Sequence, residues 1–226
     1  MTNPEPTTQQ LLAYLDEHVS QQKKDRIAEV LATRTRHFTV VLEDIHKEHN
    51  ASAVIRTCDC YGVQDLHIVE NKNRYNVNPY VTRGASKWVS MHRWQGGSEA
   101  IAQCYDRLRQ QGYRIVATSP HAEAHTPDTL PIDQKLAIVM GSEWEGLSDY
   151  ALAQADEHLI IPMYGFTESL NLSVSTAIIL SKIVPKLHQS DIQWRLNNTA
   201  QDELTLAWYR KIIKHVELLE KRFWQK

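Results

Sequence analysis

The chain of 226 residues lacks most features of secreted and membrane proteins. Its three cysteines are too few for the disulfide framework of a small secreted domain. No apolar stretch is long enough to cross a bilayer. The N-terminus is polar and acidic before any apolar run, which is unlike a signal peptide. These absences predict a cytoplasmic protein with no membrane association.

The chain also lacks an excess of positive charge. Its 25 lysines and arginines face 27 acidic residues, so the formal net charge of −2 does not favour nucleic-acid binding. The basic side chains are nevertheless concentrated in an N-terminal helix, a central loop and the C-terminal stretch: Lys23, Lys24, Arg26, Arg34 and Arg36; Lys72, Arg74, Arg83 and Lys87; Arg210, Lys211, Lys214, Lys221, Arg222 and Lys226. Each cluster alone is best explained as a solvated surface. Three clusters with Trp and Tyr nearby make RNA binding as plausible as solvation.

Several common ligand-binding motifs are missing as well. The glycines do not form G-x-G-x-x-G, and no P-loop, H-E-x-x-H or C-x-x-C occurs. The histidines at 46, 49, 121 and 125 have no metal-ligand spacing with cysteine. We therefore expect no metal site and no Rossmann dinucleotide site.

What remains is an alternation of short apolar runs and helical patterns. Strands are predicted at residues 37–43, 66–69, 88–94, 114–118, 136–140 and 159–163. Helices are predicted at 8–33, 50–61, 98–111, 148–155, from 169 towards 185, and 199–224. Strand–helix alternation favours an α/β fold with a mainly parallel sheet flanked by helices. The last predicted helix also repeats apolar residues on one face, so it is suited to packing against the core as well as to binding RNA.

The segment from Leu159 to Ser175 carries the most specific pattern. A buried strand ends at Met163, a tight loop follows, and Ser169 is placed to cap a helix. Small polar and apolar residues alternate in the run Ser-Leu-Asn-Leu-Ser-Val-Ser where simple amphipathic spacing is expected. This pattern suits a backbone turn that cradles a ligand.

Three other segments carry candidate functional side chains. Asn50 is expected to cap the helix in which Arg56 stands among small and apolar residues, with Cys58 and Cys60 facing the core. An arginine in such a helix is suited to bidentate binding of a phosphate or carboxylate. Glu143 follows a buried strand between two glycines, and Thr118 ends another strand. Because ligands bind at the carboxyl ends of strands in α/β sheets, these strand ends predict one cofactor pocket.

Together these segments resemble the three motifs of the TrmH-type branch of the SPOUT, or α/β-knot, methyltransferases. The motifs are N-x-S-A-x-x-R-T at 50–57, M-G-x-E-x-x-G at 140–146 and I-P-M-x-G-x-x-x-S-L-N-x-S-V at 161–174. The resemblance covers residues 38–183. It implies a C-terminal trefoil knot in a domain at 37–190, with helical extensions at 1–36 and 191–226. The adjacent residues Trp144 and Glu145 depart from the family pattern.

The resemblance also implies a reaction and a site. S-adenosylmethionine is expected to bind against Thr118, Gly141, Ile161, Met163 and Leu170. The catalytic group is expected to comprise Asn50, Arg56, Glu143, Ser169 and Asn171. Arg56 is then either the base or a phosphate ligand that orients the ribose. Family members are homodimers, and Asn50 and Arg56 are expected at a pocket shared across that interface.

The expected activity is 2′-O-methylation of a ribose in RNA. The best match is to the enzymes that modify the D-loop guanosine, position 18, of tRNA. The alternatives are another site in tRNA or ribosomal RNA, or a knot protein that binds RNA without catalysis. The intact set of five catalytic candidates favours an enzyme.

Overall fold

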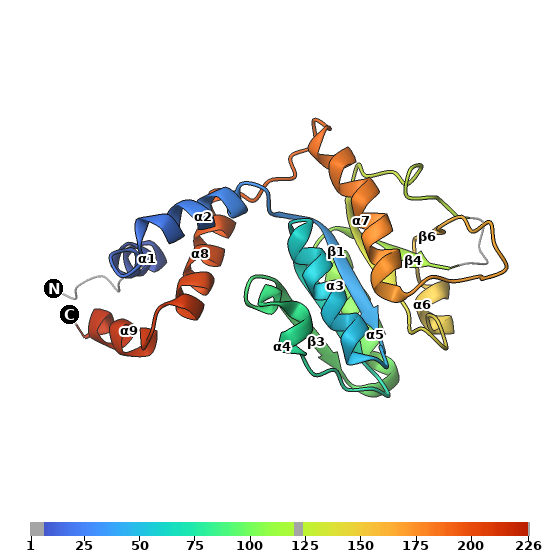
Figure 1. Cartoon of the computed structure of the whole chain (residues 1–226), viewed down its shortest axis with the longest axis horizontal. Coiled ribbons are helices and arrows are strands. Elements are labelled where there is room, and N and C mark those ends of the chain that lie inside the picture. The colour runs from blue at the N-terminus through green and yellow to red at the C-terminus, as the bar shows by residue number, and fades with distance from the viewer. Residues whose placement is uncertain (1–6, 120–123, 226) are drawn as a thin grey trace. The chain divides into compact units, whose positions relative to one another are not determined.

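The computed structural model describes residues 7–119 and 124–225. The chain divides into two compact units (Figure 1). Residues 35–194 form the larger unit, which contains the sheet. Residues 1–34 and 195–226 together form the smaller, helical unit. No helix in the described part of the chain is long and apolar enough to span a bilayer.

The larger unit is built on a parallel sheet. Its strands, within the described residues, are β1 (Thr35–Glu43), β2 (Val63–Glu70), β3 (Ser90–Gln95), β4 (Tyr113–Thr118), β5 (Lys135–Met140) and β6 (Glu157–Leu159). They lie in the order β3-β2-β1-β5-β4-β6, and each neighbouring pair is parallel. The α/β class predicted from strand–helix alternation is therefore confirmed.

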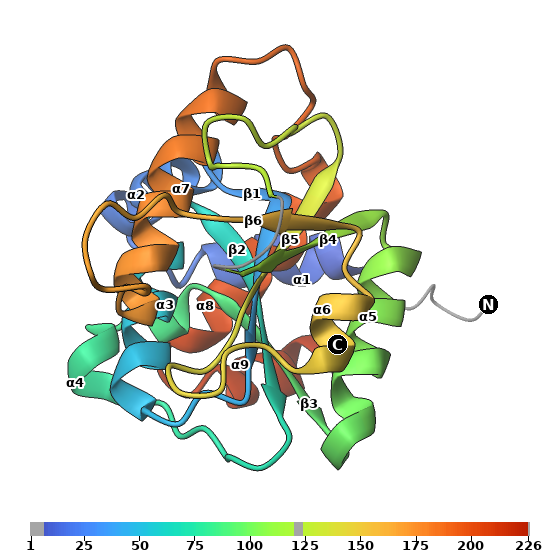
Figure 2. The same ribbon diagram turned by 90° about the vertical axis from the view of Figure 1, so that its right-hand side faces the viewer.

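Helices cover both faces of this sheet. On one face α3 (Glu48–Cys60) and α7 (Leu172–His188) pack over Val40 and Leu42. On the other face α5 (Ala100–Gln110) and α6 (Asp149–Ala153) pack with Val41. Figure 2 shows the two helix pairs on opposite sides of the strands. The alternation of side chains along β1 explains why a nearly continuous apolar run serves both layers.

Short helical turns connect some of these elements. They are α4 (Pro79–Thr82), η1 (Ala85–Lys87) and η2 (Gly97–Glu99). The turn α4 lies within the segment 71–84, for which the sequence predicts a loop, and η1 follows directly after that segment.

The smaller unit shows four helices in its described residues, where the sequence predicts two long ones. These are α1 (Thr8–Asp16), α2 (Gln21–Leu31), α8 (Asn198–Ile212) and α9 (Val216–Trp224). The prediction of single helices at 8–33 and 199–224 is wrong. His215 has a left-handed φ of 56°, which breaks the second helix. Buried Leu204, Leu206 and Trp208 show that α8 contributes to a core.

Four local predictions around the motifs are also wrong. The strand expected at 159–163 ends at Leu159, because the backbone N–H of Ile160 donates to the carbonyl of His125 outside the sheet. Asn171, not Ser169, caps α7 by accepting from the N–H of Ser173 at 2.9 Å. Lys47 stands at the cap position of α3, so Asn50 lies inside the first turn. Within the same helix Cys58 is buried as expected, whereas Cys60 is exposed.

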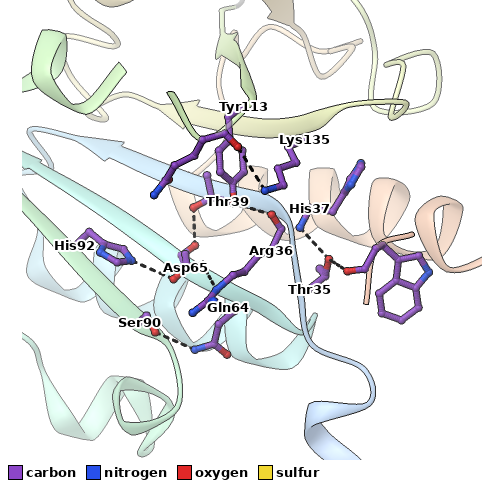
Figure 3. Close-up of polar contacts among 12 residues, drawn as sticks. Thr35, Arg36, His37, Thr39, Gln64, Asp65, Ser90, His92, Tyr113 and Lys135 are labelled. Atoms are coloured by element: carbon purple, nitrogen blue, oxygen red, sulfur yellow. Dashed lines mark hydrogen bonds and ion pairs between the residues drawn. The ribbon is translucent and has the colours of Figure 1, made fainter. Parts of the chain in front are cut away.

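A polar network ties the amino ends of the strands together (Figure 3). The Asp65 carboxylate accepts from Arg36 Nε and His92 Nε2, both at 3.0 Å. Tyr113 Oη donates to the Arg36 carbonyl at 2.6 Å. Burial raises the pKa of Asp65, but the His92 hydrogen bond and the Arg36 charge outweigh it and hold that pKa below its ordinary value. This network lies at the amino ends of the strands, whereas the motif loops follow their carboxyl ends.

Candidate functional site

The motif loops surround a cavity of about 440 Å³ at the carboxyl ends of three strands. Thr118, Met140 and Leu159, which end β4, β5 and β6, form its floor. Its walls come from residues 141–147, the segment 160–170 and the start of α7. The cavity is lined by all five expected cofactor residues and by two of the expected catalytic ones: Thr118, Gly141, Ile161, Met163, Leu170, Glu143 and Ser169. The predicted meeting of strand ends at one pocket is confirmed.

Two glycines shape the hairpin that follows β5. The backbone groups of Ser142 and Gly146 exchange hydrogen bonds at 3.0 and 3.1 Å. A Cβ on Gly141 would lie 2.2 Å from the carbonyl carbon of Gly146, so only glycine fits there without a shift. Gly146 itself has a left-handed φ of 70°, which glycine adopts without steric cost. The hairpin places Glu143 at the pocket wall.

The far end of this hairpin is fastened to β1. The Glu43 carboxylate accepts from the backbone N–H of Ser148 at 2.9 Å and from its hydroxyl at 2.7 Å. Burial raises the pKa of Glu43 above its ordinary value despite these two hydrogen bonds. This anchor, which the sequence analysis missed, positions the hairpin from the neighbouring strand.

A chain of side-chain hydrogen bonds joins the three motifs. Asn50 Nδ2 donates to Glu143 Oε1, and Asn171 Nδ2 donates to Asn50 Oδ1 at 3.1 Å. Asn171 Oδ1 in turn accepts from the Ser173 hydroxyl at 2.7 Å. Asn50 is only 6% exposed. Its side chain contacts Glu143 and Asn171 and does not have the helix-capping role that was expected. Three candidates from separate motifs are thereby brought into direct contact.

The second carboxylate oxygen of Glu143 lacks a hydrogen-bond partner among the described residues. This atom, Glu143 Oε2, is also buried. Leaving a buried carboxylate oxygen without a donor is costly, which points to a donor supplied by a ligand.

Arg56 lies apart from this network. It is exposed on α3, six residues beyond Asn50. At about 100° per residue, that spacing turns its side chain about 120° around the helix axis from Asn50. Within one chain the structure therefore brings together Asn50, Glu143 and Asn171, with Ser169 on the same pocket, but not Arg56.

The pocket is chemically suited to S-adenosylmethionine. Ile161, Leu172 and Ile179 provide apolar walls of the kind that accept an adenine ring. Glu143, Glu145 and Glu168 also line the cavity, and carboxylates suit a cofactor that carries a sulfonium and an ammonium. No group of three or more His, Cys, Asp or Glu residues in the described chain is arranged to hold a metal ion.

Sequence analysis missed several lining residues on α7. Leu172, Ser175 and Ile179 all face the cavity. Their spacing of three and four residues places them on one side of a helix, so this signal was present in the sequence. It was obscured because the expected helix began at Ser169, before the true start.

This fold and site define a class of protein: a parallel α/β RNA methyltransferase of the SPOUT type, with its pocket formed by motif loops at the strand ends. The family model of the SpoU rRNA methylase family matches residues 37–181. The chain belongs to this family.

Relatives extend the match beyond the larger unit. The chain is 40% identical over 209 residues to a tRNA (guanosine(18)-2′-O)-methyltransferase of Borreliella burgdorferi, covering 92% of this chain and 94% of the relative. The crystal structure of a TrmH/SpoU tRNA modifying enzyme of A. aeolicus matches with a TM-score of 0.76 and 29% identity, over 86% of this chain and 98% of that one.

A more distant neighbour shares the fold and was solved with a cofactor. The SpoU methyltransferase AviRb of Streptomyces viridochromogenes, in complex with AdoMet, matches with a TM-score of 0.56 and 19% identity. The match covers 72% of this chain and 62% of that protein. S-adenosylmethionine is thus a ligand of this fold in at least one relative.

Proposed function

We propose that this chain methylates the 2′-hydroxyl of a ribose in tRNA, most specifically guanosine 18 of the D loop, with S-adenosylmethionine as the methyl donor. The observation that carries the proposal is the hydrogen-bonded chain Asn50–Glu143–Asn171 beside a pocket lined by the expected cofactor residues. The Borreliella relative supports the choice of guanosine 18, since it matches along 92% of this chain.

The pocket residues contribute mainly by binding and orientation. S-adenosylmethionine, when bound, supplies a methyl group on a positively charged sulfur, which is a good leaving group. Positioning the acceptor hydroxyl in line with that methyl then provides much of the rate enhancement. Glu143 Oε2 is free to accept a hydrogen bond from a ligand, while Asn50 holds Oε1 in place. Asn171 orients Asn50 from the start of α7.

Arg56 fits this scheme as a contribution from a second subunit. Its exposed position on α3 leaves the guanidinium outside the pocket of its own chain. A phosphate contact needs only the charged form of the side chain. A role as base requires a neutral guanidine, which is costly because the pKa of arginine lies above ~12. Both roles place Arg56 beside the RNA, and we propose that it serves the pocket of the partner.

A homodimer is part of the same proposal. Val174 on α7 is 45% exposed and Leu170 before it is 39% exposed, next to the pocket. Leu180, further along the same helix, is fully buried. The exposed apolar residues around the start of α7 are of the type that forms a symmetric dimer interface.

The test is methyl transfer by the purified full chain to an unmodified tRNA transcript. Mass spectrometry of digested nucleosides should show 2′-O-methylguanosine. The same transcript with 2′-deoxyguanosine at position 18 should remain unmodified. Methylation of that control at another nucleotide would contradict the assignment of position 18.

The non-catalytic alternative has its own readout. Calorimetric titration with S-adenosylhomocysteine should show binding if the chain is an enzyme. A protein that binds tRNA but neither binds S-adenosylhomocysteine nor transfers methyl groups would be an RNA-binding scaffold.

A further inference from the structure

An exposed tryptophan stands at the mouth of the pocket. Trp144 follows Glu143 in the hairpin after β5 and lines the cavity, yet 81% of its surface is exposed. Tryptophan is usually well buried, because its large apolar ring gains free energy on leaving water. An indole presented to solvent beside a ligand site is therefore a candidate binding group.

The backbone under this indole is held firmly. The paired hydrogen bonds between Ser142 and Gly146 close the hairpin. The N–H of Glu145 donates to the Ser142 hydroxyl at 3.1 Å. The Glu145 carboxylate also pairs with Lys72 Nζ at 2.8 Å, although both groups are exposed, so this contact adds little stability. A ring on such a hairpin loses little backbone entropy when a partner binds.

The exposed fraction indicates which partner the ring meets. The inner wall of the cavity is formed by buried Leu159, Leu172 and Ile179. A cofactor seated against that wall meets the part of the indole that lines the cavity. The part of this 81% exposed ring that faces away from the cavity is available to a second molecule lying across the mouth of the pocket.

The loop that contacts this hairpin carries two basic residues. Lys72 reaches Glu145 from the loop after β2, and exposed Arg74 lies on the same loop. A basic loop in contact with a hairpin that carries an exposed aromatic ring matches the alternation of phosphates and bases in a single-stranded segment. Unpaired bases stack on aromatic side chains, whereas paired bases inside a helix are inaccessible to them.

We propose that Trp144 is a stacking platform for an unpaired nucleobase of the RNA substrate at the mouth of the pocket. The inference rests on the proposed function, because it takes the substrate to be an RNA whose ribose enters this site. It assigns Trp144 a positioning role. The ring holds the RNA segment so that the acceptor hydroxyl faces the pocket, and takes no part in the chemistry.

The test compares Trp144→Ala and Trp144→Phe with the wild-type full chain in steady-state kinetics. We expect Trp144→Ala to raise the KM for tRNA about tenfold, or about 1.4 kcal/mol, the size of one base–aromatic stack. Trp144→Phe should recover most of that loss, because phenylalanine retains a stacking face. The calorimetric affinity for S-adenosylhomocysteine should stay within about twofold in both variants. Tyr150→Ala is the matched control, since Tyr150 is 43% exposed but does not line the cavity.

A fluorescence measurement provides an independent readout. Addition of tRNA should quench tryptophan emission in the wild-type protein, and the quenching should be reduced in Trp144→Phe. This readout needs no turnover, so it separates the two proposals. Wild-type protein that shows Trp144-dependent quenching but no methyl transfer would contradict the proposed function and support the stacking role.

Three results would overturn the proposal. One is an unchanged KM and affinity for tRNA in Trp144→Ala. Another is a loss of S-adenosylhomocysteine affinity that parallels the loss of tRNA affinity, which would assign the ring to the cofactor. The third is wild-type protein that does not bind tRNA at all, which would overturn the proposed function as well.

Discussion

At the scale of single residues, Arg56 and the asparagine–glutamate chain have separable roles. We expect Arg56→Ala to abolish methyl transfer while leaving the affinity for S-adenosylhomocysteine nearly intact, because Arg56 lies outside the pocket of its own chain. Kinetics and calorimetry on the same preparation check this. His49→Ala is the matched control, because His49 is exposed seven residues earlier on the same side of α3. A parallel loss of cofactor affinity would show that the assigned role of Arg56 is wrong.

A mixing experiment tests whether Arg56 acts across subunits. Arg56→Ala and Glu143→Gln are each expected to be inactive alone. Mixed dimers should regain up to about a quarter of the wild-type activity, since half of randomly exchanged dimers are mixed and each has one complete site. Light scattering should first show a dimer at micromolar concentration. A monomer, or a mixture without recovered activity, would remove the shared-site proposal.

At the scale of elements, the hairpin after β5 depends on its first glycine. Gly141→Ala should reduce the S-adenosylhomocysteine affinity strongly and lower the free energy of unfolding by about 1–3 kcal/mol, because the new Cβ meets backbone that cannot move aside cheaply. Gly146→Ala has open space around its Cβ, so it should cost only the left-handed strain of about 1–2 kcal/mol. Calorimetry and thermal unfolding distinguish the two. Equal cofactor affinities in both variants would contradict the close-approach argument.

The pair of strands β2 and β3 should make stability sensitive to acid. Burial, together with the neighbouring charge of His92, lowers the pKa of His67 from 6.5 to about 4. Trp94 Nε1 donates to His67 Nδ1 at 3.0 Å, which requires that ring nitrogen to be unprotonated. The unfolded chain therefore binds a proton near pH 6.5, before the folded chain does. Stability is complete above that pH and falls towards pH 4, by up to about 3 kcal/mol.

Urea unfolding at several pH values between 7.5 and 4 checks this prediction. His67→Gln keeps an acceptor for Trp94 but cannot titrate, so its stability should change less over this range. Some dependence should remain, because burial also lowers the pKa of His37. An identical pH profile in the variant and the wild type would exclude His67 as the cause.

At the scale of the whole molecule, the smaller unit is expected to supply RNA affinity. Its helices line an open hollow of about 530 Å³, and the ionisable residues of that lining are all of basic type: His18, Lys23, Lys214, His215 and Arg222. Replacing Lys23, Lys214 and Arg222 together by alanine should weaken tRNA binding. The slope of the logarithm of the binding constant against the logarithm of the salt concentration should become shallower by up to about 2 to 3. S-adenosylhomocysteine affinity should not change. Binding measured over a series of salt concentrations checks this, with Lys135→Ala as a control cation at the amino edge of the sheet.

Point substitutions are preferable to truncation in this experiment. Removal of the chain after residue 201 would delete Leu204, Leu206 and Trp208, which are buried. These buried residues give α8 a core role, and the RNA role is proposed only for the exposed basic side chains. Unchanged tRNA affinity and salt dependence in the triple variant would leave the core role as the one function of these helices.

The sequence by itself determined the fold class and many members of the pocket. Strand length, apolar runs and strand–helix alternation are local signals, and they predicted a parallel α/β sheet with its pocket at the strand ends. The glycines at 141 and 146 were recognisable because a tight turn restricts which residue fits. The resemblance to a known family selected residues that line the cavity, including Thr118, Ile161 and Leu170.

Only the tertiary structure decided how these residues are joined. Asn50 reads as a helix cap from its neighbours alone, but Glu143 and Asn171 approach it from segments about a hundred residues away, and these distant partners determine its role. Element ends were misplaced for the same reason. The strand β6 ends at Leu159 because Ile160 donates to His125, and Asn171 at the start of α7 donates to Asn50. At this binding site, hydrogen bonds between distant segments override local propensity. For that reason the hydrogen-bond network of the site could not be predicted from the sequence.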